Sequence, residues 1–331
     1  MSTETTPTTA SLNAPLHAPL PVTLHANLNG IAKLSHLGVI RVAGADAAPF
    51  LQGQLTQDFL TLGAHEARLA AFCSAKGRMQ ASFISFKKSS AEADDILLVC
   101  NRDILPATVK RLSMFVLRAK VKLSDASGEF GLFGLAQNAI YSVAGYACPV
   151  GVTGQFGIYF VVGLREVDGS PRALCLAPAG DPSPVGELMD EAVWLWGEVR
   201  SGIASINAQT VDKFVPQMLN YESVGGVNFK KGCYPGQEVV ARSQFRGTLK
   251  RRAYLVHCDA PMAAGDEVFV ATDADQAVGT VAQAAPSPQG GFDAVVSMQV
   301  AAALAGGLRL GSATGAALEL LPLPYPLLED I

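Results

Sequence analysis

Several short stretches of the first part of the chain have the pattern of β-strands, either alternating hydrophobic and polar residues, as in 38–44, or a short apolar run bounded by turn residues. These stretches are 38–44, 70–73, 79–86, 96–100, 119–123 and 130–135. Apolar residues recur at helical spacing after Asp46, which can cap a helix, and again from about Asn101 to Phe115. Hairpins and helices that alternate irregularly predict an α+β fold rather than a doubly wound parallel sheet.

The pattern changes in the second half of the chain. Residues 158–164 and 172–177 are predicted strands, and 187–202 form a predicted helix that carries both tryptophans, Trp194 and Trp196. Beyond Arg246, short predicted strands are separated by Gly, Pro and Asp turns; they are 252–257, 267–270, 279–284, 294–300 and 317–321. This pattern of short strands and turns is typical of a small antiparallel β-barrel or sandwich. We therefore expect interleaved α+β lobes in residues 27–247 and a small C-terminal β-barrel in 248–331.

The start of the chain shows no recognisable targeting pattern. Met1–Pro21 is rich in Thr, Pro and Ala, and the first basic residue is Lys33. A signal peptide needs a positive start and a continuous apolar run, and a transit peptide is rich in arginine. No stretch reaches the ~18 charge-free apolar residues of a membrane span. Residues 1–26 are therefore predicted to be a disordered tail, and we expect a cytoplasmic protein without membrane contact.

The amino-acid composition further limits which class of protein this chain can be. A chain of 331 residues with 49% hydrophobic and 16% charged residues can build two or three packed units. Its 25 basic and 29 acidic residues give a net charge of −4, which argues against a general nucleic-acid binder. Contact with RNA would therefore require a local basic patch.

The six cysteines contain no C-x-x-C pair, which argues against a zinc ribbon or a run of iron–sulfur ligands. Their scatter fits free thiols in a reducing compartment, and most are expected to be small buried hydrophobes. Cys233 differs, because it lies in the glycine-rich segment 225–242 and follows Lys230 and Lys231 closely in the sequence. A helix is predicted at 236–242, and both a helix N-terminus and nearby lysines stabilise a thiolate. The residues alone leave open whether Cys233 is reactive or merely packs in a turn.

Basic residues gather around the same segment. They are Lys230, Lys231, Arg242, Arg246, Lys250, Arg251 and Arg252, with Glu238 as the only acid among them. Glu238 and Arg242 are spaced i, i+4 and can pair. The cluster predicts either a solvated surface or an anion site, for a carboxylated ligand tail or an RNA backbone.

The segment Lys231-Gly232-Cys233-Tyr234-Pro235-Gly236-Gln237-Glu238 resembles the signature of the YgfZ-type branch of the folate-binding, glycine-cleavage T-protein-like family. Residues 44–46 with 50–58, 76–79 and 214–220 resemble further motifs of that family, so the resemblance covers roughly Leu34 to the end. Pro235 stands where the signature more commonly has Thr, and proline lacks both the hydroxyl and the amide donor.

The resemblance implies a three-lobed α+β protein around a central cavity that binds tetrahydrofolate or another folate derivative. It also implies an accessory factor in iron–sulfur protein maturation and tRNA thiomodification, with iron–sulfur client or assembly proteins as partners. Cys233 and Lys231 are the candidate reactive residues. Trp194 stands where the family stacks an aromatic residue on folate, and Leu37 stands where it has a second one. The other candidate folate-binding residues are Lys230, Gly232, Tyr234, Gly236, Gln237, Glu238, Arg242 and Arg246.

Two alternative functions are left open. An aminomethyltransferase would need an acidic residue beside folate, but the matching place holds Gln80 and Ala81, and neither is a base at neutral pH. A direct tRNA-binding module would use the basic cluster, although the net charge and the absence of an RNA-recognition motif oppose it.

Overall fold

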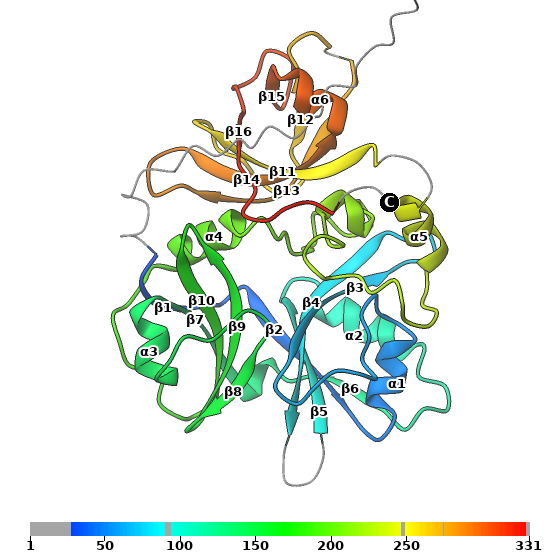
Figure 1. Ribbon diagram of the computed structural model, residues 1–331, viewed down its shortest axis with the longest axis vertical. Coiled ribbons are helices and arrows are strands. Elements are labelled where there is room, and N and C mark those ends of the chain that lie inside the picture. The colour runs from blue at the N-terminus through cyan, green and yellow to red at the C-terminus, as the bar shows by residue number, and fades with distance from the viewer. Residues whose placement is uncertain (1–27, 90–93, 246–248, 274, 329–331) are drawn as a thin grey trace, which may run out of the picture.

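The computed structural model describes residues 28–89, 94–245, 249–273 and 275–328. Within these ranges the chain forms three antiparallel sheets, two of five strands and one of six (Figure 1). The two five-stranded sheets lie next to one another, and the six-stranded sheet lies across one end of both (Figure 1). The predicted tail, residues 1–26, lies outside the described residues.

The first sheet has the strand order β3-β4-β5-β2-β6. Its strands are β2 (Leu37–Ala43), β3 (Ala67–Cys73), β4 (Met79–Ser89), β5 (Asp94–Asn101) and β6 (Lys122–Asp125), and its helices are α1 (Ala47–Gln52) and α2 (Leu105–Ser113). The predicted strands and helices of this part are present, but α1 ends at Gln52, before Leu55 and Phe59, which the helical spacing had placed on it. Asp46 does not cap α1 with its side chain, because its carboxylate accepts the backbone N–H of Lys120 at 2.6 Å.

The second sheet has the strand order β1-β7-β10-β9-β8. Its strands are β1 (Gly30–Lys33), β7 (Phe130–Ala136), β8 (Thr153–Phe156), β9 (Tyr159–Val167) and β10 (Ser170–Pro178), and α3 (Asn138–Ala144) packs beside it. The sequence predicted β7, β9 and β10. It did not predict β1, β8 or α3, because elements of four to seven residues give a periodic pattern too few positions to stand out.

The third sheet has the strand order β15-β12-β13-β14-β11-β16. Its elements are β11 (Arg251–Cys258), β12 (Glu267–Val270), β13 (Gly279–Pro286), β14 (Phe292–Gln299), α6 (Val300–Ala305), β15 (Leu308–Leu310) and β16 (Glu319–Leu321). The predicted strands are present, but they form a curled, open sheet rather than a closed barrel. The short helix α6 was missed, because its uniformly apolar sequence has no polar face to reveal helical spacing.

Helix α4 (Glu191–Arg200) lies directly under the six-stranded sheet (Figure 1). It begins later than predicted, and Asp190 caps it by accepting a backbone N–H at 2.9 Å. Trp196 is buried on this helix and donates from Nε1 to Asp293 of β14 at 2.8 Å. One continuous apolar core consequently includes α4, residues of both five-stranded sheets and one face of the third sheet.

The remaining elements connect these layers. They are the 3-10 helices Ser127–Glu129 and Pro216–Leu219 and the helix α5 (Gln237–Phe245). After β16 the chain returns to the main body, where the Tyr325 hydroxyl donates to the Gly202 carbonyl at 2.7 Å. Among the described residues, every helix is too short or too polar to cross a membrane.

Candidate functional site

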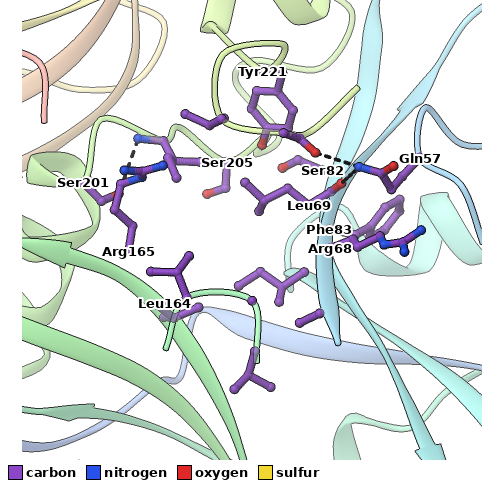
Figure 2. Close-up of a pocket in the computed structure, with 18 of the residues that line it drawn as sticks. Gln57, Arg68, Leu69, Ser82, Phe83, Leu164, Arg165, Ser201, Ser205 and Tyr221 are labelled. Atoms are coloured by element: carbon purple, nitrogen blue, oxygen red, sulfur yellow. Dashed lines mark hydrogen bonds between the residues drawn. The ribbon is translucent and has the colours of Figure 1, made fainter. Parts of the chain in front are cut away.

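A cavity of about 460 Å³ lies between the two five-stranded sheets (Figure 2). Strands β3 and β4 line one side, and β9 with Arg172 of β10 lines the other. Other parts of the wall come from Leu37, Glu198 and the loops that contain residues 57–66, 150–151, 201–205 and 221–228. The wall is mostly apolar, with a few polar side chains that Figure 2 labels: Gln57, Arg68, Ser82, Arg165, Ser205 and Tyr221. This size and this mixture are typical of sites for small molecules.

The charges on the β3 side of the cavity are paired within the protein. Arg68 Nε lies 2.6 Å from Glu66 Oε1, and the hydrogen bond from Arg68 is the main reason that the pKa of Glu66 is lowered. Beside this pair, Gln57 Nε2 donates to the Gly225 carbonyl at 2.7 Å (Figure 2). This hydrogen bond connects the cavity wall with the loop that leads to Cys233.

The other end of the cavity holds Arg172 from β10 and Glu198 from α4. The Arg172 guanidinium carbon lies 4.2 Å from the centroid of the Trp194 ring. Trp194 is fully buried behind it, and its Nε1 donates to Glu198 Oε1 at 2.8 Å. We expected Trp194 to stack directly on a ligand, but the structure places Arg172 over its ring instead.

His36 links two carboxylates at this end of the cavity. Its Nδ1 lies 3.2 Å from Glu191 Oε1, and its Nε2 lies 3.3 Å from Glu198 Oε1. Burial alone would lower the pKa of His36, but hydrogen bonds and charges from both glutamates raise it to about 8. Burial acts to raise the pKa of Glu198, but His36, the Arg172 charge and the Trp194 hydrogen bond together outweigh it, and the pKa is lowered. Burial lowers the pKa of Arg172 to about 10, which is still well above neutral pH. Arg172 and Glu198 are therefore both charged at neutral pH.

Cys233 lies apart from the cavity and is the one exposed cysteine of the six, all of which fall in the described ranges. Burial raises the pKa of the thiols of Cys73, Cys100 and Cys175 to about 12. Cys148 is also buried, although it lies in the loop between α3 and β8. Exposure therefore distinguishes Cys233 from the other five cysteines.

Lys231 anchors the loop that carries Cys233. Its side chain is buried, and Nζ donates to the carbonyls of Gln52 and Leu55, the latter at 2.6 Å. Gln52 is the last residue of α1, where unpaired carbonyls attract a cation, and Leu55 lies just beyond the helix. Nζ also lies 4.9 Å from the centroid of the Tyr234 ring. Burial lowers the pKa of Lys231 to about 8, partly offset by electrostatic interactions with Asp58 and Cys233.

Pro235 and Gly236 form a tight turn rather than the first turn of a helix. Gly236 has a φ of +80°, and the Gln237 N–H donates to the Tyr234 carbonyl at 3.2 Å. Helix α5 begins at Gln237, one residue later than expected. The turn therefore separates Cys233 from the helix N-terminus that the sequence placed next to it.

The segments that carry the family resemblance meet around this loop although they are far apart in the sequence. Thr56 donates from Oγ1 to the Gly226 carbonyl at 2.7 Å. The Met79 N–H donates to the Phe214 carbonyl at 2.7 Å. Gln217 is fully buried, and its Nε2 donates to the carbonyl of Val240 in α5 at 2.8 Å. The four segments therefore form one connected substructure.

The basic residues of this region do not form one exposed patch. Lys231 and Arg252 are buried, and Arg252 pairs with the buried Glu222 at 2.7 Å. Arg242 pairs with Glu238 at 2.5 Å, as the i, i+4 spacing predicted. Arg246 lies outside the described residues. Lys231 and Arg252 therefore do not belong to a single exposed anion site, one of the two arrangements that the sequence predicted for this cluster.

Among the candidate folate-binding residues, Leu37 lines the cavity and Trp194 lies behind its wall. The remaining candidates in the described ranges lie outside the wall; they are Lys230, Gly232, Tyr234, Gly236, Gln237, Glu238 and Arg242. Arg172 and Glu198 were not predicted as site residues. A signal existed for Arg172, which is the one charged residue in the mostly apolar stretch 170–178, whereas 191–200 also contains Glu191 and Arg200, so Glu198 does not stand out.

The fold defined by these sheets is that of the aminomethyltransferase T proteins. The crystal structure of the glycine cleavage system aminomethyltransferase T from Bartonella henselae superposes with a TM-score of 0.69 over 93% of this chain and 88% of that one. The sequence identity is 16%, so this likeness concerns the fold alone.

Proteins that are similar in sequence identify the family to which the chain belongs. The tRNA-modifying protein YgfZ of Colwellia psychrerythraea is 30% identical over 75% of this chain and 76% of its own length. That of Edwardsiella ictaluri is 28% identical over 95% and 98%, and an uncharacterized protein of Haemophilus influenzae is 31% identical over 81% and 86%. No family model matches the chain. The chain belongs to the YgfZ family, as the resemblance of residues 231–238 predicted.

Proposed function

We propose that this protein is a folate-binding accessory factor in tRNA thiomodification and iron–sulfur protein maturation, with Cys233 as its reactive group. The position of this thiol carries the proposal, because Cys233 alone among six cysteines is exposed, on a loop that Lys231 fixes to α1. The relatives named tRNA-modifying proteins support the tRNA part. The partners in this proposal are iron–sulfur client or assembly proteins and tRNA.

The proposal places tetrahydrofolate or a derivative in the cavity between the two five-stranded sheets, as the centre of a three-lobed arrangement. The cavity volume of about 460 Å³ and its mostly apolar wall suit the flat rings of a folate. Residues 27–247 would supply the folate-binding lobes, and residues 248–331 would cover them. Residues 231–238 lie outside the cavity wall, so in this proposal their role is to position the Cys233 thiol.

Genetic complementation tests the role of Cys233. A bacterial strain that lacks its own YgfZ protein would receive the wild type, Cys233→Ala or Cys148→Ala, the last as a control that removes a buried thiol. We expect the wild type and Cys148→Ala to restore tRNA thiomodification, measured by mass spectrometry of digested tRNA, and the activity of an iron–sulfur enzyme. Cys233→Ala should restore neither, and full complementation by it would refute the reactive role.

Binding measurements test the folate part separately. Titration calorimetry with 5-formyltetrahydrofolate should show saturable binding to the wild type and, equally, to Cys233→Ala, because the thiol lies outside the cavity. If the wild type shows no binding, the folate part of the proposal fails while the role of Cys233 stands. Turnover of an aminomethyl-lipoyl carrier would instead support the aminomethyltransferase alternative.

A further inference from the structure

Residues 104–124 form a strongly basic segment in an otherwise acidic chain. Five of the 25 basic residues and none of the 29 acidic residues fall in it; the five are Lys110, Arg111, Arg118, Lys120 and Lys122. All five are exposed, and the salt bridges found among the described residues involve other basic side chains. Residues 110–122, called the basic strip below, therefore carry positive charge that no carboxylate of the described residues pairs with.

The backbone of the basic strip is held in place at the edge of the first sheet. Lys122 begins β6, the edge strand that pairs with β2. The Lys120 N–H donates to the Asp46 carboxylate at 2.6 Å, and the Lys120 carbonyl accepts the Asp46 N–H at 3.2 Å. Exposure alternates along 118–123, because Arg118, Lys120 and Lys122 are exposed and the residues between them are partly buried. The three cations therefore face solvent from a fixed backbone.

Large apolar side chains are exposed within the basic strip. Met114 is 71% exposed, Phe115 43% and Leu117 87%. The Phe115 ring packs edge-on against Phe72 of β3, with the ring centroids 6.4 Å apart, so its position is also fixed. Apolar side chains that are exposed among cations mark an interaction surface.

A short series of contacts leads from this surface to the loop of Cys233. Phe72, which supports Phe115, forms an isolated antiparallel bridge with Leu55. The Leu55 carbonyl in turn accepts a hydrogen bond from Lys231 Nζ at 2.6 Å. Phe115 is therefore separated from the anchor of the Cys233 loop by two intervening residues.

Helix α1 provides a second connection between the basic strip and Cys233. Asp46, which holds Lys120, directly precedes α1, and Gln52, which accepts from Lys231, is its last residue. A helix of six residues is about 9 Å long. The basic strip and the Cys233 loop are therefore attached to opposite ends of one short helix.

We propose that the basic strip binds the sugar–phosphate backbone of tRNA and holds it beside Cys233, an assignment that rests on the tRNA part of the function proposed above. Lysine and arginine side chains pair with phosphate oxygens. Phe115 offers a ring face to an unpaired base, the usual way in which proteins bind single-stranded parts of RNA. The local basic patch that RNA binding requires thus lies in residues 110–122 rather than around 230–252.

The composition of the surface favours RNA over a protein or a membrane as the partner. Lysine is depleted from the centre of protein–protein interfaces, whereas contacts to phosphates use lysine and arginine. A helix that lies on a membrane presents a long apolar face, but the exposed residues of α2 are Pro, Ala, Lys, Arg and Ser. Five cations beside one exposed aromatic ring therefore fit a nucleic-acid strand best.

The salt dependence of tRNA binding tests the cations. The full chain would be titrated into a fluorescently labelled, unmodified tRNA transcript at several salt concentrations, with anisotropy as the signal. A variant that combines Arg118→Gln, Lys120→Gln and Lys122→Gln should bind about tenfold or more weakly. The slope of log K against log salt concentration should become shallower by about 2, because roughly 0.7–0.9 counterions are released per phosphate contact.

The matched control combines Lys33→Gln, Lys213→Gln and Lys250→Gln, which removes equal charge at exposed positions outside the basic strip. It should weaken binding by less than about threefold. Equal losses in the two triple variants would overturn the assignment, as would absence of tRNA binding by the wild type in about 50 mM salt. Neither result would alter the complementation test of Cys233, so the proposed function is judged separately.

Phe115→Leu distinguishes RNA from any other polyanion, because it keeps an apolar contact with Phe72 but removes the ring. It should weaken tRNA binding by about fivefold or more and leave heparin binding within about twofold. Equal effects on tRNA and heparin would show that the surface attracts charge alone and would overturn the RNA assignment. Binding of phosphatidylserine vesicles in preference to tRNA would overturn it as well. Melting temperatures verify that each variant is folded, and Phe115→Leu decides the question if the triple variant does not fold.

Cross-linking tests whether the bound tRNA lies beside Cys233. Azidophenacyl bromide should attach to Cys233 in the folded protein, since the other five cysteines are buried. Illumination of the labelled wild type with tRNA should then give a protein–RNA cross-link, which the triple variant of the basic strip should lose. A probe attached through Lys33→Cys in a Cys233→Ala background is the control and should give little cross-link. Equal yields from the two probe positions, or no cross-link from Cys233 while tRNA is bound, would overturn the placement beside the thiol.

Discussion

Gly77 and Gly236 pack backbone against backbone, although 76–79 and 231–238 are separate segments of the sequence. A Cβ on Gly236 would lie 2.7 Å from both the Cα and the N of Gly77. It would also lie 2.4 Å from the Ser74 carbonyl oxygen. Both glycines have positive φ, +71° at Gly77 and +80° at Gly236. The loop that presents Cys233 therefore depends on a contact that only glycine permits at either position.

Gly236→Ala should therefore destabilise the protein by about 2–4 kcal/mol, because the new Cβ meets backbone atoms and the backbone conformation becomes strained. Chemical denaturation followed by circular dichroism measures this change. Gly232→Ala is the control, since a Cβ there meets no atom within 4 Å. If both substitutions change stability equally, the packing of Gly236 on Gly77 is not what constrains this loop.

Lys231→Met should cost about 1–3 kcal/mol of stability, because it keeps the buried aliphatic stem but leaves the Gln52 and Leu55 carbonyls without their donor. Lys230→Met, at an exposed neighbouring position, should change stability by less than about 0.5 kcal/mol. Denaturant midpoints of the two variants make the comparison. Equal midpoints would show that the Lys231 contacts add nothing to the fold.

The sequence was sufficient for the parts of this protein that depend on local pattern. Strand β4 was predicted from its alternating apolar and polar residues and β10 from its continuous apolar run, and Cys233 was identified from the glycines and lysines around it. The partners of Lys231 were not predictable in this way. Gln52 and Leu55 are 179 and 176 residues away in the chain, and no local pattern encodes such a contact.

The arrangement of residues around the cavity likewise could not be predicted from local sequence pattern. Trp194 was selected by its position in the family resemblance, and the sequence does not reveal that Arg172 covers its ring. Arg172, Glu198 and His36 come from a strand, a helix and the loop before β2, so only the folded chain brings them together. Arg172 is the one charged residue in the stretch 170–178, and such a position does not show what the side chain faces in the folded protein.

His36 should make stability depend on pH in a defined window. The folded protein binds the His36 proton more tightly than the unfolded chain, since its pKa is raised from 6.5 to about 8. The resulting stabilisation is complete below pH 6.5 and is lost as the pH rises through 8. It amounts to about 2 kcal/mol, from roughly 1.4 kcal/mol per pKa unit.

Denaturation curves between pH 6 and 9 would measure this loss, with His36→Gln as the comparison. The variant should be less stable than the wild type at the acidic end of the range and should lack the decline that His36 causes. Parallel curves for the two proteins would mean that the contacts of His36 with Glu191 and Glu198 do not hold its proton in solution.

Cys233 should react with iodoacetamide before any other cysteine in the folded protein at neutral pH. Alkylation requires an accessible thiolate, and the other five cysteines are buried, three of them with a pKa raised to about 12. Peptide mass spectrometry after limited alkylation should therefore find Cys233 labelled and the others protected, whereas denaturant should expose all six. Gly236→Ala should disturb the loop and change the labelling rate of Cys233, while Gly232→Ala should change it less. Early labelling of Cys148 or Cys258 in the native protein would contradict the packing described here, and labelling of Cys233 only after unfolding would remove the basis for its proposed role.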